Sequence, residues 1–477
     1  MGDAMSDLNN EEIPMVFKKI EERCKIAKIT TEYVSRRLLI NIPIDNNQFK
    51  QLKLSLDRET EALLLVETNF DKFFCINDYK AIWSKELGLI EAKLQFVSPL
   101  PRPPSAILKR LLVSLYGSSE TNDDSETNDD LRLVLTSSSE WHQNIQLSIG
   151  LTSQTLSLID IFQEDLLHEK RQILRRRLDR ARSVIQEYFR PHLPYSPYKS
   201  PYPTSIAIKI ENIQINDHNH ARRILERIAN NICLQLDING VSAYLENEEQ
   251  KNHSANMLFR QSKPPISLSF PEYQFETKPM SLYWYASASI GMPLLQYLAY
   301  YQVIEYFFPS FAAIQTNDII KRLLKDPSFM NDLDRNVSRL VALIKPYIGK
   351  GGFANERDSL KATIEHCMSS EEISSFIQEE ESRNQFFKTK AQWKAIALQN
   401  IFNEGNKPEN NVVLNTALRI YEIRCKIVHT KLQDTDSQEE LLLPFSKEAN
   451  MLGYDIELLR FVARKVIINS GQQLNLR

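Results

Sequence analysis

The sequence is poor in glycine and in cysteine. Glycine makes up 12 of the 477 residues, about a third of its usual share of ~7%. So little glycine argues against a fold organised around Gly-rich phosphate-binding loops and favours a helical chain. The five cysteines are scattered and form no C-x2-C pair, which argues against a disulfide framework and a cysteine-based zinc site. This pattern is typical of a protein in the reducing cytosol.

A strong net charge is also missing, and so is a convincing membrane segment. The formal net charge of −3 excludes a uniformly basic nucleic-acid binder but leaves room for a local basic groove. The N-terminus is acidic and polar, without the apolar core of a signal peptide. Residues 281–304 carry no formal charge and reach the length of a membrane span, yet they contain five tyrosines and several other polar side chains. We expect a buried core helix there, and a cytoplasmic protein with no membrane contact.

Hydropathy patterning predicts an α+β multidomain protein. In the N-terminal half, apolar positions three to four residues apart predict helices at 12–30 and 220–236. Short apolar runs bounded by turn residues predict strands. These strands are 38–44, 62–66, 94–97, 131–135, 145–151, 206–210, 241–245 and 266–270. After about residue 280 the strand signals end and helical patterns dominate, so we expect a mixed α/β N-terminal region followed by an all-α bundle.

The patterning divides the chain into five segments. They are a mixed α/β domain (1–155), a long basic helix (156–190), a Pro/Tyr-rich linker (191–204), a small α/β unit (205–275) and a helical domain (276–477). Between Lys170 and Arg190, eight basic residues stand against two acidic ones, a local net charge of +6. Such a face either contacts RNA phosphates or is solvated and paired with acidic neighbours. The candidate RNA-binding residues are Arg171, Arg175, Arg176, Arg177, Arg180 and Arg182.

Two histidines in a polar segment, His218 and His220, are the most visible candidates for a metal site. Neither an H-E-x-x-H motif nor a matching set of cysteines and histidines completes such a site. We therefore expect both to be surface histidines, and we predict no metal ion and no cofactor.

The most informative stretch is Arg419–Lys431, with the sequence RIYEIRCKIVHTK. It contains Arg424 and His429, with four residues between them, on a segment whose apolar spacing predicts a helix. Here the sequence resembles the HEPN superfamily, and specifically its ApeA-like branch, whose domains are small helical bundles marked by Arg-x(4–6)-His. Residues 295–308, upstream, are similar to the ApeA-like first helix. The resemblance covers about residues 280–470 and nothing before residue 275.

Arginine and histidine suit the cleavage of RNA without a metal ion. That reaction needs a base for the ribose 2′-OH proton, an acid for the leaving 5′-oxygen and a cation for the phosphate. Histidine titrates near neutrality, which suits proton transfer, and the arginine fork matches phosphate oxygens. The resemblance implies that Arg424 stabilises the phosphate and that His429 is the acid/base. The implied products are a 2′,3′-cyclic phosphate and a 5′-hydroxyl.

The sequence leaves more than one role open for Cys425 and for Glu305. The position after the arginine is often Asn, Asp or His in the family, and here it is Cys425. Cys425 and His429, four residues apart, share a helix face, which leaves a thiol nucleophile or half a metal site as alternatives. Arg424 and His429 lie ~140° apart on an ideal helix, so a shared site needs a distortion, a helix end or a second protomer, and we expect a homodimer. Glu305 is either a supporting partner of Arg424 or a helix-end charge facing water.

ApeA-like HEPN proteins are associated with bacterial defence against phage. The resemblance thus implies an endoribonuclease acting on RNA, with tRNA as one candidate substrate, that arrests the host once a phage-derived trigger appears. The α/β half would be its sensor or regulator. Two alternatives are a catalytically silent HEPN module for binding or dimerisation, and a HEPN toxin neutralised by an antitoxin partner.

Overall fold

The structure is a computed structural model of the chain, which divides into two compact units. The first comprises residues 1–252, 259–272 and 476–477, and the second comprises residues 253–258 and 273–475. The structure describes residues 13–476 except 35, 46–47, 56–58, 98–103, 117–131, 138–143, 164–204, 248–267, 326, 328–332, 349–355, 389–400, 403–410, 429–441 and 445.

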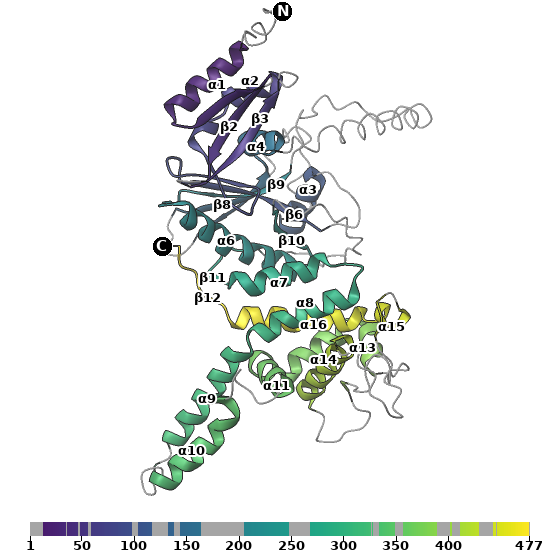
Figure 1. The fold of residues 1–477 in the computed structure, drawn as a ribbon. Coiled ribbons are helices and arrows are strands. Elements are labelled where there is room, and N and C mark those ends of the chain that lie inside the picture. The colour runs from purple at the N-terminus through teal and green to yellow at the C-terminus, as the bar shows by residue number, and fades with distance from the viewer. Residues whose placement is uncertain are drawn as a thin grey trace, which may run out of the picture. The chain divides into compact units, whose positions relative to one another are not determined.

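The first unit begins with a helix on a small antiparallel sheet. The sheet has the order β1-β2-β3 and is covered by three helices (Figure 1). Its elements are α1 (Met15–Ile26), β1 (Thr30–Val34), β2 (Arg37–Pro43), β3 (Phe49–Ser55), α2 (Glu59–Glu67) and α4 (Gln154–Gln163). The strand period of two puts Leu38, Ile40 and Ile42 on the helix side, where all are fully buried.

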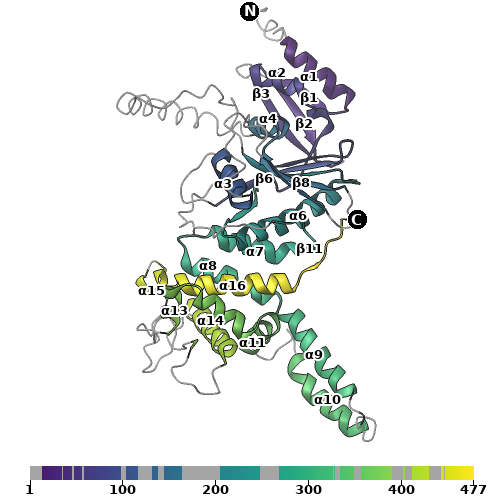
Figure 2. The same ribbon diagram turned by 180° about the vertical axis from the view of Figure 1, so that it is seen from behind.

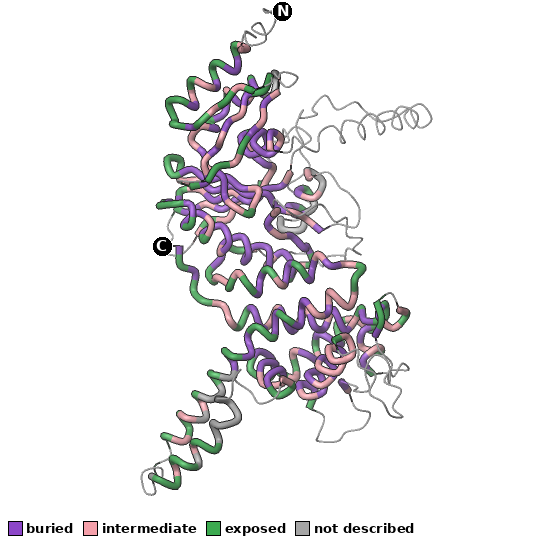
Figure 3. Tube along the Cα trace, viewed as in Figure 1, coloured by how far each residue is buried: buried purple, intermediate pink, exposed green. Residues whose placement is uncertain are grey.

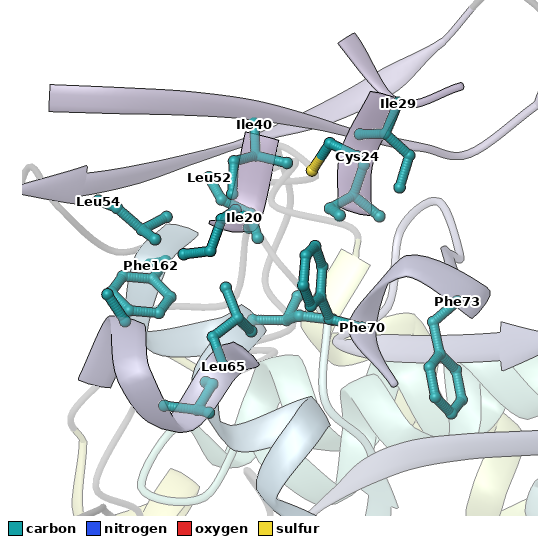
Figure 4. Close-up of a cluster of buried hydrophobic side chains, with 14 of the residues drawn as sticks. Ile20, Cys24, Ile29, Ile40, Leu52, Leu54, Leu65, Phe70, Phe73 and Phe162 are labelled. Atoms are coloured by element: carbon teal, nitrogen blue, oxygen red, sulfur yellow. The ribbon is translucent and has the colours of Figure 1, made fainter. Parts of the chain in front are cut away.

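The core of this part lies between the sheet and the helices (Figure 4). Ile20 and Cys24 of α1 meet Leu52 and Leu54 of β3, and Leu65 of α2 closes the cluster. The prediction of a strand at 62–66 is wrong, because this segment lies within the helix α2. A short apolar run fits a buried strand and a buried helix equally well, and here the helix covers the sheet.

A larger antiparallel sheet follows, with the strand order β4-β5-β6-β9-β8-β7 and β10 paired with β6. Its strands are β4 (Phe74–Cys75), β5 (Ala81–Ser84), β6 (Leu89–Phe96), β7 (Arg132–Thr136), β8 (Gln146–Leu151), β9 (Ile206–Glu211) and β10 (Ala243–Leu245). Strand β9, which patterning placed in a separate small unit, lies between β6 and β8. The helices α3 (Pro104–Tyr116) and α6 (His218–Ile238) pack on this sheet, and a short turn of helix, η2, spans Phe70–Lys72.

The two histidines at the start of α6 are buried, so the prediction of surface histidines is wrong. Asp217 caps the helix by accepting a hydrogen bond from the backbone N–H of His220. The ring of His218 accepts from the backbone N–H of Asn77 at 3.2 Å. Because the sequence shows only the polar neighbours of these residues, the loop that covers them could not be anticipated.

The second unit is predominantly helical, which confirms the predicted fold class of a mixed N-terminal region followed by helices. Its helices are α7 (Thr277–Ala288), α8 (Pro293–Tyr306), α9 (Phe308–Leu324), α10 (Leu333–Ile348), α11 (Glu356–Cys367), α12 (Ser370–Gln378), α13 (Glu381–Lys388), α14 (Val412–Val428), α15 (Lys447–Asn450) and α16 (Gly453–Asn469). A short pair of strands, β11 (Tyr273–Gln274) and β12 (Gln472–Gln473), joins the two ends of this unit.

The uncharged stretch 281–304 forms two helices rather than the single core helix predicted. The chain turns after α7 at Gly291, whose φ of +83° lies in the left-handed region that favours glycine. Pro293 then occupies the first turn of α8, where its missing N–H costs nothing. No helix among the described residues combines the length and apolar character needed to cross a membrane.

Helix α8 runs beside α16, and α14 packs against α8 and α11 (Figures 1 and 2). The hairpin of α9 and α10 extends from these helices, and most of its described residues are exposed or half-buried (Figure 3). Arg424, the described residue of the arginine–histidine motif, therefore lies where α8, α11 and α14 meet.

Candidate functional site

The motif lies at the C-terminal end of α14. One face of this helix is buried by α8, α11 and α12, and it includes Ala417, Ile420 and Ile423. The hydroxyl of Tyr297 on α8 donates a hydrogen bond of 3.1 Å to the backbone carbonyl of Ile420. Since that carbonyl lies one turn before Arg424, the bond fixes the helix next to the motif.

Arg424 is held by residues from two neighbouring helices. Its Nη2 forms an ion pair of 2.9 Å with Oε1 of Glu356, the first residue of α11. The same Glu356 oxygen accepts a hydrogen bond of 2.7 Å from the hydroxyl of Tyr301 on α8. The guanidinium also lies 5.5 Å from the centre of the Tyr301 ring, within the range of a cation–π contact. We call Arg424, Glu356 and Tyr301 the arginine cluster.

The charges of this cluster stabilise one another. Partial burial lowers the pKa of Arg424 most, but Glu356, Tyr301 and Cys425 together outweigh it, so the pKa is raised and the guanidinium stays charged. Burial, the hydrogen bond to Glu356 and the charge of Glu356 all raise the pKa of the Tyr301 hydroxyl. The tyrosine is thus a hydrogen-bond donor rather than a proton acid near neutral pH.

Glu305 lies one turn after Tyr301 on the same face of α8, and it is exposed. Among the described residues its carboxylate forms no ion pair or hydrogen bond; the partner of Arg424 is Glu356 instead. Partial burial and the charge of Glu356 raise the pKa of Glu305, and Arg424 opposes them. Glu305 is therefore a carboxylate near the cationic group but not paired with it.

Cys425, the residue after Arg424, is half-buried. Its thiol hydrogen-bonds with the hydroxyl of Tyr421, which raises the pKa of that tyrosine, and also with the side chain of Arg424. The Cys425 thiol is thus a polar contact of the Arg424 side chain.

A second arginine of the same helix, Arg419, was not singled out by sequence reasoning. Its Nε and Nη2 form hydrogen bonds of 2.6 and 3.0 Å with the two carboxylate oxygens of Asp455 on α16, and both residues are buried. The rings of Phe386 and Phe387 lie 5.5 and 5.3 Å from the guanidinium. This buried Arg419–Asp455 ion pair holds α14 against α16, and its charges are not accessible to a ligand.

Two of the predicted functional elements lie outside the described residues. One is His429, which follows Val428, the last residue of α14. The other is the set of basic candidates Arg171, Arg175, Arg176, Arg177, Arg180 and Arg182. Within the described ranges, no three His, Cys, Asp or Glu residues gather as metal ligands would.

Sequence reasoning also missed Glu356 and gave Tyr301 no role. The only local signal for Glu356 is an acidic residue in the first turn of a helix, a position that the helix dipole favours. For Tyr301 the signal is the spacing of four residues to Glu305, which puts the two side chains on one helix face.

The arginine cluster can bind an anionic group. A guanidinium that stays charged, is partly desolvated and is held by a carboxylate and a ring has the chemistry of a phosphate-binding arginine. Among the described residues, Glu356 forms its ion pair with one terminal nitrogen of this guanidinium, Nη2. Comparison with protein-family models, curated proteins and solved structures found no match to this chain.

Proposed function

We propose that the protein is a metal-independent endoribonuclease of the HEPN type that acts in defence against phage. The observation that carries the proposal is the arginine cluster, whose charged, part-buried guanidinium belongs to the residue five positions before His429. Neither residue needs a metal ion for phosphate binding or proton transfer. The family assignment rests on the resemblance of residues 280–470 to ApeA-like HEPN domains.

In the proposed reaction the ribose 2′-oxygen attacks the adjacent phosphorus. Arg424 stabilises the charge that develops on the phosphate oxygens, and His429 transfers a proton. The products are a 2′,3′-cyclic phosphate and a 5′-hydroxyl. A homodimer would bring two motifs to one RNA phosphate, and the first unit would regulate the reaction as a sensor of infection.

A specific observation also favours a second candidate, a catalytically silent module for binding or dimerisation. Arg424 already has an anionic partner within its own chain, Glu356, at 2.9 Å. Such an ion pair can also serve only to hold α14 against α11. On this alternative, removing the imidazole of His429 leaves every activity of the protein unchanged.

The test compares wild type with His429→Ala on total RNA in the presence of EDTA, with the new 3′ ends mapped. Lys321→Ala, which removes an exposed charge from α9, is the matched surface control. We expect cyclic-phosphate ends from wild type and the control, and none from His429→Ala. Intact RNA with wild type, together with equal toxicity of wild type and His429→Ala in cells, would contradict the proposal and favour the silent module.

A further inference from the structure

Two carboxylates of the second unit face the same arginine but differ in their surroundings. Glu356 is the ion-pair partner of Arg424 and the acceptor for Tyr301. Glu305 is close enough for both of their charges to act on it, yet it has no partner among the described residues and is exposed. Arg424 is thus near two carboxylates, and among the described residues it forms an ion pair with Glu356 but not with Glu305.

The position of Glu305 is set by the helix. Tyr301 and Glu305 are four residues apart on α8, so their Cβ atoms lie ~6 Å from one another on the same face. Tyr301 is buried and anchored to Glu356. The anchoring of Tyr301 directs the face of α8 that carries Glu305 toward Arg424.

The end of α8 also disfavours the charged form of this carboxylate. Glu305 is the penultimate residue of α8, where the carbonyl end of the helix dipole is negative. Partial burial and Glu356 raise the pKa of Glu305 further, against the opposing effect of Arg424. A carboxylate whose pKa is raised is a stronger base, which suits it to accept a proton.

We propose that Glu305 accepts the proton of the ribose 2′-OH and that Glu356 positions Arg424 on the scissile phosphate. This inference rests on the proposed ribonuclease function and assigns the base that it leaves open. Glu305 is suited to the role because its carboxylate is exposed, and so accessible to a bound RNA, and forms no ion pair with a described residue. Glu356 is suited to positioning because its contacts fix the guanidinium from one side.

The carboxylate of Glu305 takes the proton from the 2′-OH, and the 2′-oxygen forms a bond to phosphorus. The bond from phosphorus to O5′ breaks, and O5′ takes a proton from the imidazolium of His429. The step ends with a neutral Glu305, a neutral His429, a 2′,3′-cyclic phosphate and a 5′-hydroxyl, and both side chains return to their starting states by exchange with water.

The experiment measures the rate of cleavage of a single-stranded RNA by the full chain from pH 4 to 9. Glu305→Gln keeps the shape of the side chain and cannot accept the proton. Glu365→Gln removes an exposed carboxylate of α11 that forms an ion pair with Lys361, and is the matched control. We expect Glu305→Gln to be ~100-fold slower or worse near neutral pH, with the control at the wild-type rate and both at the wild-type melting temperature.

The pH profile separates a proton acceptor from a merely structural residue. A base must be ionised, so the wild-type rate falls as the pH drops through the pKa of Glu305, and this acidic limb disappears in Glu305→Gln. Because Glu356 raises the pKa of Glu305, Glu356→Gln should move the limb to lower pH. An RNA with a 2′-deoxyribose at the cleavage site should remain intact with every variant.

The outcomes distinguish this inference from the proposed function. If wild type cleaves, His429→Ala does not, and Glu305→Gln retains the wild-type rate and acidic limb, the inference is overturned while the ribonuclease function stands. If wild type forms no cyclic-phosphate ends and is as toxic to cells as His429→Ala, the ribonuclease function itself is overturned, and with it the inference.

Discussion

Two arginines five residues apart on α14 lie in opposite environments. Arg419 is buried, bonded through two nitrogens to Asp455 and enclosed by two phenylalanine rings. Arg424 keeps 17% of its side chain exposed and has one ion pair, to Glu356. The same residue type thus serves the fold at one position and is open to a ligand at the other. The difference comes from the neighbouring helices, because α16 supplies a buried partner to Arg419 whereas α11 supplies the partly exposed Glu356 to Arg424.

The largest expected effect is on stability, at Arg419. Arg419→Met leaves the buried Asp455 without its partner, which typically costs ~3–5 kcal/mol. Urea unfolding followed by circular dichroism would measure the loss. The double variant Arg419→Met, Asp455→Leu should recover much of it, because no unpaired charge is left. If Arg419→Met lowered the free energy of unfolding by less than ~1 kcal/mol, the Arg419–Asp455 ion pair would not be what holds α14 to α16.

Arg424 should show the opposite behaviour, a large effect on activity and a small one on stability. Arg424→Ala should lower the cleavage rate ~100- to 1000-fold, as expected for a lost donor to a developing oxyanion. Its half-exposed ion pair should be worth only ~1 kcal/mol or less in urea unfolding. Arg424→Lys retains the charge but not the planar fork, so an intermediate rate is expected. Equal rates for all three proteins would remove Arg424 from the site.

Tyr301 links the cluster to α8 through its hydroxyl. Tyr301→Phe removes the donor to Glu356 and should cost ~0.5–1.5 kcal/mol in urea unfolding. Tyr285→Phe, at an exposed position of α7, is the matched control and should leave the unfolding midpoint unchanged. If the two variants unfold at the same midpoint, the hydroxyl of Tyr301 contributes nothing to the cluster.

The smallest expected difference is in how readily the cysteine thiols of the folded protein are alkylated. Burial raises the pKa of Cys24 and of Cys367 to about 12, so these thiols stay protonated and shielded at pH 7. Cys425 is only half-buried, and we expect iodoacetamide to label it first, as peptide mass mapping would show. Labelling of Cys24 ahead of Cys425 in the folded protein would contradict this order.

The sequence predicted elements whose signal is local and missed those that depend on distant partners. The helix that carries Arg424, the alternating strand at 206–210 and the predominance of helices after residue 280 all follow from periodicity, and the structure confirms them. The partners of the two arginines, Glu356 and Asp455, belong to other helices and share no spacing with the motif. The predictions of a strand at 62–66 and of a surface position for His218 were wrong for the same reason. Packing against residues distant in the sequence determines both the helix at 62–66 and the burial of His218.

The most direct test of the central claim uses wild type and Arg424→Ala on RNA in EDTA, with melting temperatures and new 3′ ends measured on the same preparations. The account predicts cyclic-phosphate ends from wild type and none from Arg424→Ala, at nearly equal melting temperatures. The same ends from both proteins, or none from wild type, would contradict it.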